Sequence, residues 1–236
     1  MDEAAWNSTP GEVLDSSGRG RHGTAGQDAT TVIDAQRGTV GAFDGTGDYV
    51  VISPNQDFNL NRNGTISCWV KFADLELPEA THRIVGGANY HQTFLLNQYG
   101  SRLFAYWGST GGPQATTASN TFLEGAWYHL AVTNDDGALA VYVDGSLKAT
   151  GSQSSTAYDW NHALYIGGYP TTWTVNGYVD DVAIWTEALE PRLIAALAAG
   201  VSPLAVPEPS TLLLAVLGLT GLLACAYRRT QLRRIA

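Results

Sequence analysis

The stretch YHLAVTNDDGALAVYVDGSLKATG, residues 128–151, decides the fold class. It holds three short runs rich in β-branched and aromatic residues, which favour strands. Two turn signals, Asn134-Asp135-Asp136-Gly137 and Asp144-Gly145, separate these runs. Asp-Gly suits a hairpin turn that needs positive φ at both central residues. The stretch therefore predicts a three-stranded antiparallel meander.

Similar runs recur on both sides of the meander, with Gly, Asn, Asp, Ser and Thr between them. They cover residues 50–53, 66–72, 164–167 and 178–185. Helical periodicity before the C-terminal tail is confined to EALEPRLIAALAAG, residues 187–200, where Pro191 fits a first turn and Gly200 an end. We expect an all-β domain over residues 1–203 that is closed by one short C-terminal helix.

The charge of the chain is divided unevenly. Up to Val206 there are nine Lys and Arg against 21 Asp and Glu, a net of −12, whereas the remainder has four Arg and one Glu, a net of +3. Nucleic-acid binding needs a basic surface that contacts phosphates. The acidic body therefore excludes nucleic acid as an expected partner, while its carboxylates are the ligands that calcium prefers.

The end of the chain has a different character from the β domain. VPEPSTLLLAVLGLTGLLACAYRRTQLRR, residues 206–234, joins a Pro-rich linker at 204–210 to an uncharged stretch at 211–227 and a basic tail at 228–236. As a helix the uncharged stretch would measure about 26 Å, close to the thickness of a hydrocarbon core. A helix buried in the domain is the alternative, but no chain remains to cover it on every side.

These features predict a single transmembrane helix over residues 211–227. The arginine-rich tail should lie in the cytoplasm, because basic residues flank the cytoplasmic ends of such helices. The β domain should then lie outside the cytoplasm, anchored to the inner membrane by its C-terminal helix.

Several motifs of the body resemble those of laminin-G-like, concanavalin-A-like jelly-roll domains. They occur in the family's order over residues 1–200: LDSSGRGRHGT (14–24), AFDGTGDYVVI (42–52), TISCWVKF (65–72), WYHLAVTNDDGALAVYVDG (127–145), LYIGGY (164–169) and NGYVDDVAIWTEAL (176–189). The resemblance implies a two-sheet antiparallel jelly-roll sandwich.

The tail resembles a PEP-CTERM sorting signal, which combines Pro-Glu-Pro, a membrane segment and an arginine cluster. The matching residues are Pro207, Glu208 and Pro209, followed by Arg228 and Arg229. This resemblance implies an exported bacterial protein that an exosortase processes near Pro-Glu-Pro. The two prolines also forbid a helix there and leave an extended peptide.

Catalytic patterns are not found in the sequence. Retaining glycoside hydrolysis on one strand needs alternating carboxylates, which would share a face, but the acids of DDVAIWTEALE are adjacent. The five histidines lack metal-ligand spacing, and no serine lies in a nucleophile-elbow pattern. The sequence predicts a domain that is not an enzyme.

Asp180 is the first candidate metal ligand. Val182 and Ile184 share its parity in the strand pattern, so Asp180 should face the core with them, while Asp181 faces out. A buried carboxylate must be paired, hydrogen-bonded or bound to a metal. The resemblance implies a structural calcium near the joined first and last strands, with Asp44 as a second candidate. Calcium and a carboxylate held by hydrogen bonds alone both remain open.

A carbohydrate surface is the other functional expectation. Sugar sites stack rings on exposed aromatic side chains, which combine an apolar face with a polar group. Candidates between the strands are Trp107, Tyr158, Trp160, Tyr169 and Trp173. The alternative is that these side chains close the ends of the sandwich, whereas Trp69, Trp127 and Trp185 lie within strand patterns and should be core.

Three classes of function follow from these features. The first is a binding or adhesion domain at the cell surface or in extracellular matrix, with glycans as partners. The second is a structural matrix protein without a small ligand, and the third is a glycoside hydrolase.

The first residues give one further expectation. Export needs an N-terminal signal peptide, and Met1-Asp2-Glu3 matches only the end of the opening strand of similar jelly rolls. We expect Met1 to be an internal methionine, with a signal peptide and further strand residues upstream. The alternative is a genuine start, with the tail alone inserting the protein after synthesis and the body left in the cytosol.

Overall fold

The computed structural model describes residues 1–55, 58, 60, 62–75, 82–87, 95–99, 101–107, 115–153 and 163–206, with residues 95–99 described by their backbone alone. Within these ranges, no helix has both the length and the apolar character that crossing a bilayer requires. The predicted transmembrane helix at 211–227, the Pro-Glu-Pro residues and the basic tail lie outside the described residues.

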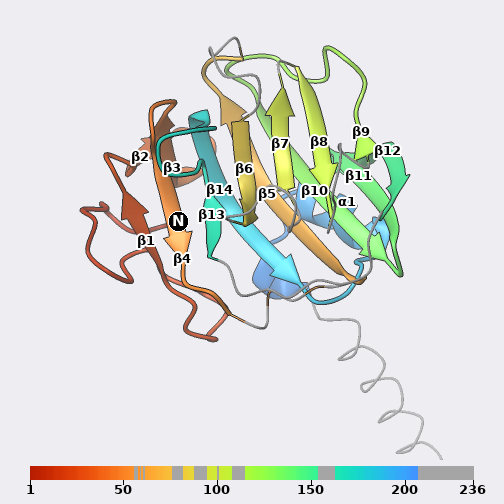
Figure 1. The fold of residues 1–236 in the computed structure, drawn as a ribbon, viewed down its shortest axis with the longest axis horizontal. Coiled ribbons are helices and arrows are strands. Elements are labelled where there is room, and N and C mark those ends of the chain that lie inside the picture. The colour runs from red at the N-terminus through yellow and green to blue at the C-terminus, as the bar shows by residue number, and fades with distance from the viewer. Residues whose placement is uncertain are drawn as a thin grey trace, which may run out of the picture.

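The described strands form two seven-stranded sheets that overlap in the view of Figure 1. All strand pairs are antiparallel, as predicted. Sheet A has the order β1 (Gly23–Gly26), β4 (Tyr49–Ile52), β13 (Leu164–Ile166), β6 (His82–Gly87), β7 (Leu95–Tyr99), β8 (Arg102–Tyr106) and β9 (Ala115–Thr116). Sheet B has the order β12 (Ser146–Ser152), β11 (Ala138–Val143), β10 (Trp127–Asp135), β5 (Gly64–Phe72), β14 (Asn176–Trp185), β3 (Gly38–Asp44) and β2 (Thr30–Asp34).

The predicted meander is confirmed as β10, β11 and β12. β10 pairs with β11 from Leu130↔Val143 to Asp135↔Ala138, and β11 pairs in turn with β12. At the second turn both Asp144 and Gly145 have positive φ, 49° and 73°. The Asp-Gly dipeptide therefore forms the turn for which its sequence is suited.

The predicted helix is confirmed as α1 (Pro191–Ala198), with Pro191 in its first turn. The backbone N–H of Val201 donates to the carbonyl of Ala196, and Gly200 has φ +89°, as expected where a glycine ends a helix. Ile194 and Leu197 are buried against a second hydrophobic cluster that includes Tyr142 and Trp185 of sheet B. The helix thus covers the side of sheet B that faces away from sheet A, and a 3₁₀ helix, η2 (Pro203–Ala205), follows it.

The main core lies between the two sheets. Strand residues of alternating parity point into it from both sides, because successive side chains of a strand lie on opposite faces. Val50, Ile66, Val70, Leu130 and Val132 are all fully buried there. The free thiol of Cys68 lies in the same core.

β14 is irregular at its centre. Up to Val179 it pairs with both β3 and β5, and then a bulge between Asp180 and Ala183 shifts the register. Asp181 at the bulge has φ +45°. Among the described residues, the stretch from Ala183 to Trp185 pairs with β5 alone. The extra residue reverses the parity of the strand, so side chains before and after the bulge follow different patterns.

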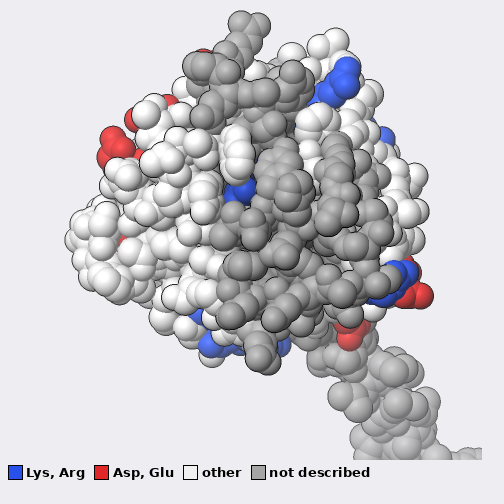
Figure 2. Space-filling model, in the orientation of Figure 1, with Lys and Arg blue, Asp and Glu red and all other residues white. Residues whose placement is uncertain are grey.

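Charged groups are unevenly spread over the described surface. In Figure 2, acidic and basic side chains lie mainly around the margin of the visible face, with one basic patch near its centre. Among the described residues, acidic side chains therefore form no continuous patch on this face.

Candidate functional site

Four aromatic side chains form a continuous cluster on the outer side of sheet A. Tyr49 and Tyr165 lie next to buried residues of β4 and β13, so alternation directs both rings away from the core. Ring centroids are 5.7 Å apart for Tyr49–Tyr165, 4.9 Å for Tyr165–Tyr169 and 6.2 Å for Tyr169–Trp173. All four side chains are half-buried. We call these four residues the aromatic cluster.

Arg83 of β6 lies beneath the end of this cluster. Its side chain is 1% exposed, and its guanidinium carbon is 5.1 Å from the ring centroid of Tyr169 and 5.2 Å from that of Trp173. One guanidinium nitrogen donates to the carbonyl of Gly87. A cation over an aromatic face is attracted by the ring quadrupole, so Arg83 fixes where the two rings lie.

The loop that carries Tyr169 and Trp173 has an unusual backbone. Tyr169 and Thr172 exchange two backbone hydrogen bonds, while Thr171 and Trp173 have positive φ, 74° and 55°. Such conformations cost about 1–3 kcal/mol each for residues other than glycine, and they cluster at functional sites. The loop begins at Gly167, φ +78°, where a Cβ would lie 2.2 Å from the ring of Phe43. Only glycine fits there, so this residue sets the path of the loop.

Three carboxylates gather on the other side of this loop. Oxygens of Asp28, Asp44 and Asp48 lie within 4.8 Å of one another. Asp48 is 1% exposed and accepts hydrogen bonds from the backbone amides of Asp28, at 3.2 Å, and Asp44, at 2.9 Å. Asp28 and Asp44 are exposed. We call these three residues the acidic triad.

Burial is the largest cause of a raised pKa at Asp48, which reaches about 6. The charges of Asp44 and Asp28 raise it further, whereas the amide of Asp44 opposes the change. No ion pair joins the triad to Lys or Arg in the described part of the chain. Closely spaced carboxylate oxygens of this kind are what a hard divalent cation such as calcium takes as ligands.

The aromatic cluster and the acidic triad are neighbours. Asp48 precedes Tyr49, and a Cβ on Gly168 would lie 2.2 Å from the carbonyl oxygen of Asp48. The amide of Gly47 donates to the hydroxyl of Thr174 at 2.9 Å. The 167–174 loop therefore packs against the triad with one part and presents the aromatic rings with another. A cation in the triad would stabilise the loop that positions Tyr169 and Trp173.

Asp180 lies elsewhere, on the outer side of sheet B. It is 4% exposed, pairs across the sheet with Trp69, and forms an ion pair with the Nε of Arg37 at 2.8 Å. The expected parity is wrong because the bulge at Asp181 separates Asp180 from Val182 and Ile184, which pack on the main core. Arg37 also contacts Asp181 at 2.5 Å. Since a guanidinium already neutralises this carboxylate, the geometry favours the acidic triad over Asp180 as a calcium site.

Arg37 belongs to a network of charges and rings on sheet B. Its guanidinium lies 4.3 Å from the ring centroid of Trp69 and 5.5 Å from that of Trp127. The Nζ of Lys71 contacts a carboxylate oxygen of Asp34, and the indole N–H of Trp127 donates to the other oxygen at 3.0 Å. Burial alone would raise the pKa of Asp34, but Lys71, a backbone amide and Trp127 lower it to about 2.

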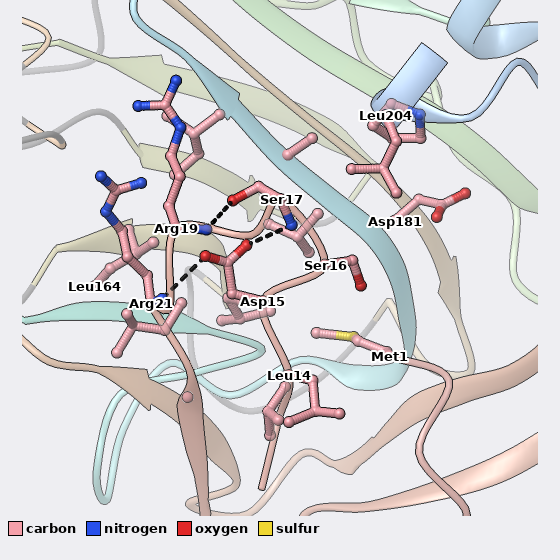
Figure 3. Close-up of a pocket in the computed structure, with 18 of the residues that line it drawn as sticks. Met1, Leu14, Asp15, Ser16, Ser17, Arg19, Arg21, Leu164, Asp181 and Leu204 are labelled. Atoms are coloured by element: carbon pink, nitrogen blue, oxygen red, sulfur yellow. Dashed lines mark hydrogen bonds between the residues drawn. The ribbon is translucent and has the colours of Figure 1, made fainter. Parts of the chain in front are cut away.

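A groove of about 450 Å³ lies at the end of the sandwich. The loop 14–21 forms one wall of the groove. The last residues of β14 and the residue after it, Val182 to Thr186, form the other wall, and residues between Ser202 and Val206 close the groove. Figure 3 shows Asp15 directing its carboxylate to the backbone of its own loop. None of the residues of the aromatic cluster or the triad lines this groove.

The structure brings together only some of the residues expected from the sequence. Tyr169 and Trp173 are neighbours, and Asp44 lies in the triad. Trp107 is 2% exposed and belongs to the main core, so it is not part of an exposed aromatic surface. Tyr158 and Trp160 lie outside the described residues. Trp185 is buried as expected, whereas Trp69 and Trp127 are half-buried on the outer side of sheet B.

Sequence reasoning missed five residues of the candidate site. They are Tyr49, Tyr165, Arg83, Asp28 and Asp48. For three of them a signal was present. Tyr49 and Tyr165 each stand next to buried aliphatic residues of a strand, and this position predicts that their side chains lie on the opposite face. Asp48 follows Asp44 by four residues in a Gly-rich turn, and this pattern also placed two acids together.

Comparison with protein-family models settles the fold family. Residues 44–195 match the model of the concanavalin A-like lectin/glucanases superfamily. The chain belongs to this superfamily. Residues 205–229 match the PEP-CTERM protein-sorting motif, which indicates an exported, membrane-associated protein. A comparison with curated proteins gave no match.

Solved structures share this superfamily's fold at low sequence identity. Domain 4 of AbnA, a GH43 extracellular arabinanase from Geobacillus stearothermophilus solved with arabinotriose, has a TM-score of 0.58 and 20% identity, covering 79% of this chain and 92% of that one. The binding domain of botulinum neurotoxin serotype D has a TM-score of 0.64 and 15% identity, covering 83% of this chain and 51% of that one. Trypanosoma rangeli sialidase has a TM-score of 0.53 and 20% identity, covering 76% of this chain and 30% of that one.

This chain matches only part of two of these solved structures. This chain spans about half of the neurotoxin binding domain and less than a third of the sialidase, but nearly all of the arabinanase domain. What they have in common with this chain is the sandwich.

Proposed function

We propose that the chain is an exported, non-catalytic binding domain for carbohydrate, and that the aromatic cluster is its sugar-binding surface. The observation that carries this proposal is the contact between the aromatic cluster and the acidic triad through one strained loop. Half-buried tyrosine and tryptophan rings offer apolar faces to sugar rings and polar groups to hydroxyls. The arabinanase domain, solved with arabinotriose, provides independent support for this ligand class.

Calcium is part of the proposal. In the acidic triad it would take oxygens of Asp28, Asp44 and Asp48 and stabilise the loop that presents Tyr169 and Trp173. Asp48 is almost inaccessible and accepts two backbone amides. This burial supports a structural role for the triad and opposes a hydrolytic one, because a catalytic acid must reach the glycosidic oxygen.

The tail gives the location. Residues 211–227 would cross the inner membrane with Arg228 and Arg229 on the cytoplasmic side, and the domain would stay anchored until an exosortase acts near Pro207-Glu208-Pro209. After processing, the domain would bind glycan at the cell surface or in extracellular matrix.

The test is a glycan screen of the full chain in detergent micelles, with arabino-oligosaccharides included, in calcium and in chelator. For any bound sugar, Trp173→Leu should weaken affinity about fivefold to tenfold, since one stacked ring contributes roughly 1 kcal/mol. Trp127→Leu, the same change on sheet B, should leave affinity unchanged. Folding of both variants is checked by thermal unfolding.

Equal losses in the two variants would show that the aromatic cluster is not the binding surface. Absence of binding to every glycan would favour the second candidate, a structural matrix protein, in which the same rings serve only to pack the loop onto sheet A.

A further inference from the structure

The groove at the end of the sandwich lies where the chain leaves the domain. Val206 is 6% exposed and packs in the cluster beneath α1, and the residues just before it form one wall of the groove. The uncharged stretch begins at residue 211. Even a fully extended chain from Val206 to that residue spans at most about 18 Å.

This length restricts the orientation of the domain. A domain of about 200 residues has a radius of gyration of about 16 Å. The segment that joins Val206 to residue 211 is therefore only about as long as this radius. When residues 211–227 are inserted in a bilayer, the end that holds Val206 must face the lipid. The groove and its rim are at that end.

The rim has the composition of a lipid-facing surface. Leu14 and Leu204, on opposite walls, are 57% and 65% exposed, and Val201, the residue before Ser202 of the groove, is 41% exposed. Two of the nine basic residues of the body, Arg19 and Arg21, lie in the Leu14 wall. Arg19 is exposed, and the guanidinium carbon of Arg21 lies 5.7 Å from the ring centroid of Phe58, another residue of the groove; both arginines are labelled in Figure 3.

The acids of the same rim are mostly engaged within the protein. Asp15 accepts the backbone amides of Ser17 and Arg21, each at 2.9 Å, and Asp181 is paired with Arg37. Asp2 remains exposed. Exposed apolar side chains flanked by arginines bind an interface through buried apolar area and attraction to anionic lipid.

We propose that this end of the domain docks on the surface of a bilayer that contains anionic phospholipid, with Leu14 and Leu204 entering the headgroup region. In the docked state the groove end of the sandwich faces the bilayer, and the aromatic cluster does not contact the lipid. The proposal rests on the membrane anchoring proposed above, and its test separates the two.

The experiment uses the full chain reconstituted in vesicles of phosphatidylcholine with and without phosphatidylglycerol. An environment-sensitive fluorophore is attached at Ser16→Cys, in the groove wall, or at Ala118→Cys, an exposed residue just after β9, which is the edge strand of sheet A opposite to β1. Both labels are placed in a Cys225→Ser background, where the remaining thiol, Cys68, is buried. Quenching by lipids labelled near the headgroup should be at least about twofold stronger at residue 16 than at residue 118.

Two variants sharpen the result. Leu14→Ser with Leu204→Ser should remove the excess quenching at residue 16, whereas Leu123→Ser, a change of a leucine that is 70% exposed at the other end of the sandwich, should not. Omitting phosphatidylglycerol should reduce the excess, because it removes the attraction to Arg19 and Arg21.

The outcomes separate the two proposals. Protein that sediments with the vesicles but shows equal quenching at both labels overturns docking and leaves the anchor intact. Protein that fails to sediment overturns the anchor, and docking with it.

Discussion

The aspartates on sheet B have cationic partners, whereas those beside sheet A have one another, although burial raises the pKa of Asp180 on sheet B in spite of Arg37. On sheet B, Asp34 lies against Lys71 and Asp180 against Arg37. Beside sheet A, Asp28, Asp44 and Asp48 lie against one another. The pKa of Asp34 falls to about 2, while that of Asp48 rises to about 6. Each of these two aspartates on sheet B thus has a cationic partner within the fold, whereas the triad lacks a positive partner among the described residues.

The largest effect should come from removing a cation on sheet B. Arg37→Met leaves Asp180 buried beside Asp181 without its partner, which should cost roughly 3–5 kcal/mol of unfolding free energy. Urea unfolding measures this. Arg62→Met is the matched control, because its partner Asp136 is 83% exposed, and its cost should stay below about 1 kcal/mol. A loss for Arg37→Met no larger than that of the control would contradict the view that sheet B depends on internal pairing.

Adding a cation beside sheet A should have the next largest effect. Calcium at a hundredfold excess over its Kd should raise the free energy of unfolding by about 2.7 kcal/mol, since it supplies the positive charge that the triad lacks. Thermal unfolding in calcium and in chelator measures the gain. Asp44→Asn should abolish it while keeping an acceptor for the amide of Thr46.

Asp136→Asn, an exposed acid at the β10–β11 turn, is the control and should leave the calcium response unchanged. The same melting temperature in calcium and in chelator would mean that the triad is not a cation site under those conditions.

The smallest effect is the pH dependence in chelator. Because the folded-state pKa of Asp48 is raised from 3.8 to about 6, its neutral form is favoured on folding, and stability should fall as pH rises through this window. The shift alone corresponds to about 3 kcal/mol, and we expect about 1–2 kcal/mol because the neighbouring Asp28 and Asp44 are exposed and solvent screens their charges. Asp34 affects stability in the opposite direction. Its pKa is lowered from 3.8 to about 2, so it stabilises the fold above pH 3.8, and this stabilisation is lost as the pH falls from about 4 to about 2.

Unfolding free energies from pH 2 to 7 test both signs. Asp48→Asn should flatten the slope between pH 4 and 6, and it should leave the acid limb due to Asp34 in place. A wild-type slope in the upper window that persists in Asp48→Asn would assign the effect to another group.

Much of the fold could be predicted from local patterns. The Asp144-Gly145 hairpin and the Pro191 start of α1 depend on residues close in sequence, and both are found where they were expected. The candidate site depends on contacts between distant residues. Arg83 reaches Tyr169, and Gly47 donates to Thr174, across 86 and 127 positions of the chain. No local pattern contains such distances.

Asp180 shows a different limit of prediction. Alternation is a sound rule for a regular strand, but the bulge at Asp181 inserts one residue and reverses it. Asn, Asp and Gly tolerate positive φ, so the Asp-Asp pair permitted a bulge without requiring one. The partner, Arg37, lies 143 positions earlier in the chain.

The position of β14 between β5 and β3 has a consequence for the order in which the protein can fold. Its strand partners lie more than a hundred residues earlier in the chain, and at about 10 residues per second a ribosome needs roughly 10 s to make the intervening segment. Until then β3 and β5 have no strand between them, and both expose unpaired backbone groups. A chain with such long-range pairing folds slowly, and sheet B cannot be completed before nearly the whole domain has been synthesised.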